Sequence, residues 1–137
     1  MNKFLVPVAT ALMLSACATQ GFDGNAGAMC NEMNTHCVQV TVSGNTISVD
    51  REKLRVRGPS HVIFWRINNA GGQNYSFADN GIAFDTESGR RQFSCVRQQP
   101  TVFRCIDPNS ERGEFKYTVR LEGSPAVKPL DPWVIND

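Results

Sequence analysis

Hydrophobic and polar residues alternate along much of the chain after residue 36. Residues 38–42 read Val-Gln-Val-Thr-Val, and the alternation resumes at Ile47 after the turn-forming Ser-Gly-Asn-Thr of 43–46. Period-two alternation places one row of side chains on a buried face and the next on an exposed face, as in a β-strand. Residues 37–50 are therefore predicted to form a β-hairpin.

The remaining strands are predicted from the same pattern. They cover residues 54–57, 61–67, 75–77, 93–105 (as a hairpin) and 114–121. Residues 62–65 are four consecutive large apolar residues, which predicts a central strand covered on both faces. Residues 79–92 are polar and read as irregular, and no segment has the pattern of a helix of ten residues or more.

About seven short strands separated by Gly/Pro turns predict an all-β fold, a small antiparallel β-sandwich of Ig-like or cupredoxin-like type. A small β-barrel is the alternative. The 137 residues are enough for one domain.

Five cysteines add a covalent framework. Four of them, Cys30, Cys37, Cys95 and Cys105, form an even set, which in an exported domain indicates disulfides. We expect the local pairs Cys30–Cys37 and Cys95–Cys105, because a hairpin centred near Pro100 places the second pair opposite each other. The spacing lacks the tight Cys-x2-Cys pattern of zinc sites, so no metal and no cofactor is expected.

Residues 123–137 carry three prolines and end on a large apolar run, Trp133 to Ile135. A free tail would expose that run, so we expect the segment to dock on the sandwich. The prolines suggest an approach along a sheet edge, where a missing N–H is tolerated. The docked segment would help to cover the strand at 61–67.

The first residues read as an export signal. Lys3 precedes an apolar stretch at 4–14 that is too short to span a bilayer, which takes about 20 apolar residues. Residues 14–17, Leu-Ser-Ala-Cys, resemble the lipobox of bacterial lipoproteins. The resemblance implies cleavage before Cys17, diacylation (palmitate-type chains) of its sulfur and acylation of its new amino group.

These features divide the chain into three parts. Residues 1–16 are expected to be a lipoprotein signal peptide, 17–29 a lipidated cysteine with a flexible Gly-rich tether, and 30–137 a single domain that includes the docked C-terminal segment. Ala18, where an Asp would favour the inner membrane, predicts attachment to the periplasmic side of the outer membrane in a host with two membranes.

Residues 42–71, VSGNTISVDREKLRVRGPSHVIFWRINNAG, resemble the opening strands of cupredoxin-like sandwiches, and 115–119 suit the last strands of such a fold. The family's blue-copper site uses two His and a Cys, usually with an axial Met. No His, Cys or Met follows Cys105, so the resemblance implies the fold without the copper site.

The charge balance and the candidate reactive residues exclude only a few classes of function. The chain has 14 basic and 13 acidic residues and no charge block that would suggest nucleic-acid binding. Arg51, Lys53, Arg55 and Arg57 form a basic stripe, which is either a solvated face with nearby acids or a site for an acidic partner. Arg55, Arg57 and Trp133 are the candidate binding residues, and no catalytic residue stands out.

The sequence therefore predicts a membrane-anchored periplasmic lipoprotein that is not an enzyme. It would be a binding or structural module of the cell envelope, attached to the membrane by its N-terminal lipid and able to bind an envelope protein. A cupredoxin-like metal-binding or redox protein is the alternative function.

Overall fold

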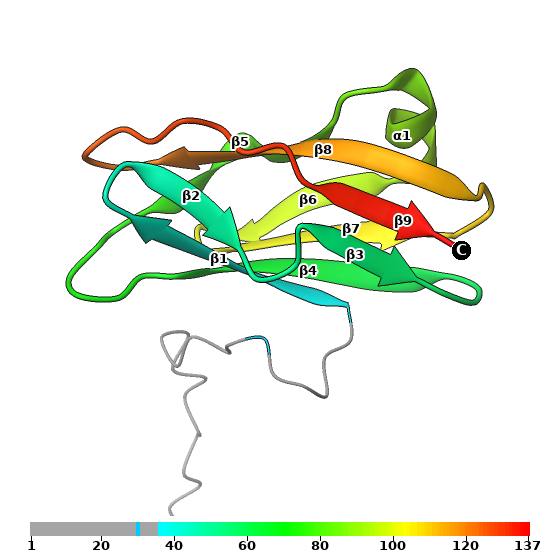
Figure 1. Cartoon of the computed structure of the whole chain (residues 1–137), viewed down its shortest axis with the longest axis horizontal. Helices are drawn as coiled ribbons and strands as arrows, with labels where there is room; N and C mark the ends of the chain where they lie inside the picture. The colour runs from blue at the N-terminus through cyan, green and yellow to red at the C-terminus, as the bar shows by residue number, and fades with distance from the viewer. Residues whose placement is uncertain (1–29, 31–35) are drawn as a thin grey trace, which may run out of the picture.

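The structure is a computed structural model that describes residue 30 and residues 36–137. The predicted signal peptide, the lipidation site at Cys17 and the tether lie outside the described residues. Within 36–137 the chain forms nine strands and one short helix, arranged as two packed sheets without closure into a barrel (Figure 1). The predicted all-β sandwich is confirmed, and the barrel alternative is wrong.

One sheet has five strands in the order β2-β1-β4-β7-β6. Their bounds are β1 Cys37–Ser43, β2 Thr46–Val49, β4 His61–Asn68, β6 Ser94–Gln99 and β7 Val102–Asp107. Both predicted hairpins are present, β1 with β2 and β6 with β7. The β1–β2 turn uses Gly44 at φ 62°, a left-handed backbone conformation that suits glycine.

The other sheet has four strands in the order β3-β9-β8-β5. Their bounds are β3 Lys53–Val56, β5 Ser76–Phe84, β8 Gly113–Glu122 and β9 Trp133–Asn136. The docked C-terminal segment is thus a strand. β9 runs parallel to β3 and antiparallel to β8, and Figure 1 shows it in red between them. The expected approach along a sheet edge is wrong for β9, because its neighbours use both of its hydrogen-bonding edges.

The core lies between the two sheets. Trp65 of β4 and Tyr117 of β8 meet there edge to face at 5.3 Å, and the Trp65 Nε1–H donates a hydrogen bond of 3.0 Å to the Tyr117 hydroxyl. Buried polar atoms need such a partner, since an unpaired donor costs about 1–3 kcal/mol. This hydrogen bond therefore allows Trp65 and Tyr117, two large aromatic residues with polar atoms, to be buried in the core.

Both predicted disulfides are present, Cys30–Cys37 and Cys95–Cys105. Cys95 and Cys105 are directly opposed in the β6–β7 ladder, as the hairpin predicted. Cys30–Cys37 fixes residue 30 to the start of β1, and Cys37 lies beside Phe64 of β4.

Two local predictions are wrong. Residues 79–92 are not irregular, because β5 extends to Phe84 and helix α1 spans Glu87–Gln92, capped by the Thr86 side chain, which accepts a hydrogen bond from the Gly89 N–H. β4 is central in its sheet, and the four-stranded sheet packs against its inner face only. Its inward residues Ile63 and Trp65 are fully buried, whereas Val62 is 41% exposed. β9 belongs to the opposite sheet, so it covers only the inner face of β4.

Candidate functional site

The outer face of the five-stranded sheet is the most distinctive surface of the domain. Only three large hydrophobic residues of the described chain are strongly exposed, Val62 (41%), Val96 (48%) and Ile106 (43%), and all three lie in this sheet. Val62 and Ile106 are directly opposed across β4 and β7. Exposed apolar residues that cluster on one face, instead of scattering singly, are typical of an interaction surface.

An aromatic ring and two arginines complete this surface. Phe64 and Arg104 are opposed across β4 and β7, and Arg104 is opposed to Val96 on its other side. The Arg66 guanidinium lies over the Phe64 ring, 5.5 Å from its centroid, which is a cation–π distance. We call this surface the open face; it comprises Val62, Phe64, Arg66, Val96, Arg104 and Ile106.

The alternation of β4 and β7 explains why these side chains point outward. Their neighbours Ile63, Trp65, Phe103 and Cys105 are almost completely buried between the sheets. Because side chains alternate along a strand, the residues between them must lie on the other face. The apolar run at 62–65 therefore serves two surfaces, the core and the open face.

The basic stripe lies on the outer face of the other sheet. Arg55 and Arg57 both contact the side chain of Asp137, at 3.1 and 3.2 Å, and hydrogen bonds led by that from Arg57 hold the pKa of Asp137 below its ordinary value. The acid that pairs with Arg55 and Arg57 is thus the C-terminal residue Asp137, 82 and 80 positions away in the sequence. Such exposed ion pairs contribute little to stability, and a role of the two arginines in binding stays a prediction.

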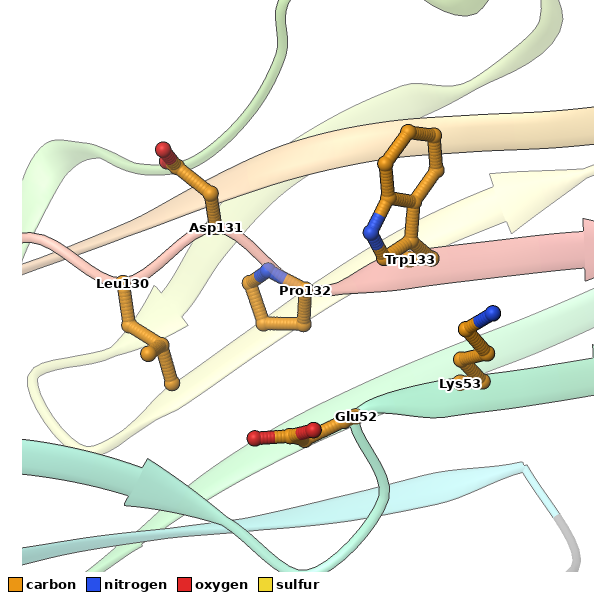
Figure 2. A pocket seen from close by; sticks show the side chains of 6 residues that line it. All are labelled: Glu52, Lys53, Leu130, Asp131, Pro132 and Trp133. Carbon is orange, nitrogen blue, oxygen red and sulfur yellow. The ribbon is translucent and has the colours of Figure 1, made fainter.

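Trp133 is half-buried beside this stripe, and the Lys116 ammonium lies 5.9 Å from its ring centroid. Trp133 also borders a small pocket of about 160 Å³, which Figure 2 shows with its lining residues Glu52, Lys53, Leu130, Asp131, Pro132 and Trp133. Ligand pockets usually reach about 300–1,000 Å³. This one is too small to enclose an ordinary organic ligand, and its mixed charges select no single ligand class.

A second hollow, of about 320 Å³, lies between β5, α1 and β6 and is lined by Ile82, Ala83, Phe84, Arg90, Phe93 and Cys95. Its walls are mostly apolar. The Arg90 Nη1–H donates to the Asp85 carbonyl at 2.9 Å, and Cys95 is in a disulfide, so its two reactive groups are already engaged.

A polar cluster closes one end of the sandwich. Asp107 is fully buried, and its Oδ1 accepts hydrogen bonds from Gln92 Nε2 (2.8 Å), the Asn109 N–H (2.8 Å) and Asn136 Nδ2 (3.2 Å). These bonds tie α1, β7 and β9 together. Because a buried carboxylate requires several donors, the cluster fixes the relative positions of those three elements.

The two histidines meet at the same end. The His36 and His61 rings lie 4.2 Å apart, and His61 Nε2 is 2.7 Å from the Arg57 carbonyl, to which it can only donate. Burial, followed by the charge of His61, lowers the pKa of His36. In the described part of the chain no group of three or more His, Cys, Asp or Glu side chains is placed to hold a metal ion. The four cysteine sulfurs are in disulfides and are not thiolate ligands.

The chain matches no protein-family model and none of the curated proteins. Among the described residues, no helix is long and apolar enough to cross a membrane.

Sequence reasoning found neither the open face nor the histidine pair. The apolar run at 62–65 predicts cover on both faces for Val62 and Phe64, and no pattern in the sequence marks Val96 or Ile106 as exposed. The signal that could have found the face is parity. Arg104 and Ile106 flank Cys105 in the strand. Because side chains alternate between the two faces, they lie on the face opposite to the buried Cys105. His36 and His61 are 25 positions apart, so only strand pairing brings them together.

Proposed function

We propose that this protein is a lipid-anchored, non-catalytic binding module of the cell envelope that uses the open face to hold a protein partner. The observation that carries the proposal is the open face itself, with exposed apolar side chains and arginines on one face of a five-stranded sheet. Aromatic residues and Arg are enriched at protein interfaces, and a pre-formed rigid surface lowers the entropic cost of binding.

The position of the first disulfide supports this proposal. If Cys17 carries the lipid, a tether of about a dozen residues leads to Cys30, and Cys30 is bonded to Cys37 beside Phe64. Fully extended, such a tether reaches about 40 Å at roughly 3.4 Å per residue. The domain would stand free of the bilayer, with the open face accessible to other proteins of the envelope.

Lipidation is tested by substitution of Cys17. We expect wild-type protein to incorporate a radiolabelled fatty acid and to sediment with the outer membrane, because stable anchoring needs more than one acyl chain. Cys17→Ser should lose the label and leave uncleaved precursor or unanchored protein. Unchanged labelling and sedimentation of Cys17→Ser would refute the anchor.

Binding is tested by affinity purification from mildly solubilised envelopes. We expect the wild-type protein to retain a stoichiometric partner and Ile106→Asp to lose it, because burial of a new carboxylate among the apolar residues of the open face is costly. Glu114→Lys changes a charge on an exposed position of the other sheet and is the matched control. Equal recovery with all three proteins would show that the open face is not the binding surface.

A further inference from the structure

We infer that the partner of the open face is a protein surface that presents carboxylates around an apolar centre. This inference rests on the proposed function and specifies its partner.

Among the residues that the structure describes, the charge of the open face is positive and has no acidic partner on that face. Only one acidic residue occurs in the five strands of this sheet, and it is Asp107, which is fully buried and engaged in the polar cluster. Asp50, just beyond β2, accepts a hydrogen bond from the Gln39 N–H at 2.8 Å. Arg66 and Arg104 form no ion pair or side-chain hydrogen bond with any residue that the structure describes.

Other arginines of the domain contrast with this pair. Arg55 and Arg57 contact Asp137, and Arg97 of β6 contacts Asp79 at 2.8 Å. Carboxylates of the described residues thus pair with these three arginines, and none pairs with Arg66 or Arg104. Arg forms planar, bidentate hydrogen bonds with carboxylates, so carboxylates on a partner are the chemically matched ligands.

The composition of the open face favours a protein partner over a lipid surface. It combines Phe64 with valine, isoleucine and arginine and contains no lysine, which is the composition of an interface core. Its apolar residues lie within strands and are less than half exposed. Side chains that are level with a sheet surface can pack against another protein but cannot insert deeply into a bilayer.

A second copy of this chain is disfavoured by charge. Face-to-face pairing of two copies would place four arginines, and no acid of the open face, in one interface. Like charges at an interface oppose association, whereas carboxylates between the two arginines would favour it. The protein should therefore be a monomer in solution.

The inference is tested by photocrosslinking of the lipidated, full-length protein in its host. A benzoyl-phenylalanine at position 96 should give one adduct with a partner protein, whose crosslinked segment carries Asp or Glu next to apolar residues. Arg66→Glu combined with Arg104→Glu should lower the adduct yield by about tenfold or more, since paired interfacial charges contribute at least that much. The Lys substitutions at both positions keep the charge but lose the bidentate geometry, so they should lower the adduct yield less than the Glu substitutions. Arg112→Glu, at an exposed loop position, should leave the adduct unchanged.

Each outcome of these experiments supports or refutes one of the two proposals. An adduct that survives both Glu substitutions refutes the acidic partner and leaves the binding function standing. Absence of any adduct at position 96 refutes the function as well.

Unlipidated Cys17→Ser protein should not sediment with phosphatidylglycerol vesicles, and arginine-dependent sedimentation would reassign the open face to the membrane. A dimer in sedimentation equilibrium that Arg104→Glu alters would reassign it to a second copy. Equal melting temperatures of the wild-type protein and its Glu and Lys variants would show that a change in binding is not caused by unfolding.

Discussion

The place of β9 in the fold gives the sharpest stability prediction. Val134 is completely buried, and it is directly opposed to Leu54 of β3 and Phe115 of β8, which are also buried. Val134→Ala removes about two methylene equivalents from this site, worth roughly 0.8 kcal/mol each, and leaves a cavity. We expect a loss of about 2 kcal/mol in the free energy of unfolding.

Thermal and urea unfolding measure this loss. For a domain of this size 1 kcal/mol shifts the melting temperature by roughly 4–8 °C, so Val134→Ala should melt roughly 8–16 °C below the parent. Val96→Ala is the matched control, because it makes the same substitution in a strand at a position that is 48% exposed. Both changes remove the same two methyl groups, so the difference between them reports mainly the burial of the site. If the two variants melt together, β9 is not part of the core as described.

Three further predictions concern single groups. Tyr117→Phe should cost about 1–3 kcal/mol in urea unfolding, because the Trp65 N–H loses its acceptor in the core; an unchanged midpoint would contradict this. Replacing Cys95 and Cys105 with Ser should cost about 2–5 kcal/mol and more than removal of the other disulfide, since Cys105 is fully buried within the sheet; equal losses would show that both pairs act only on the unfolded chain. The lowered pKa of His36 means that the unfolded chain takes up its proton first, so stability should fall as the pH drops through about 6.5. His36→Gln should lack that part of the loss between pH 7.5 and 5, and parallel pH profiles would refute it.

The strands that alternate strictly were predictable from the sequence. β1, β2 and most of β8 show period two without interruption, and the β6–β7 hairpin was located by its turn and its cysteines. β5 was recognised only at its start because its pairing with β8 shifts register between Phe77 and Ile82, which breaks the alternation. α1 has six residues, too few for helical periodicity to be visible.

The candidate site was harder to predict because it depends on which face of each strand is covered. A run of four apolar residues has no polar face, so the sequence could not show that Val62 and Phe64 lie outside while Ile63 and Trp65 lie inside. Strand pairing between distant segments also determines which arginines have an acidic partner. Asp137 reaches Arg55 only because β9 runs beside β3, 82 positions later in the chain.

The proposal that the open face is the binding surface is tested most directly by crosslinking from both faces of the sandwich in living cells. The photoreactive residue is placed at Val96 on the open face or at Glu114, which is exposed on the outer face of the other sheet. We predict a single high-yield adduct from position 96 and none of that mass from position 114. Equal adducts from both positions, or an adduct from position 114 alone, would contradict the proposal.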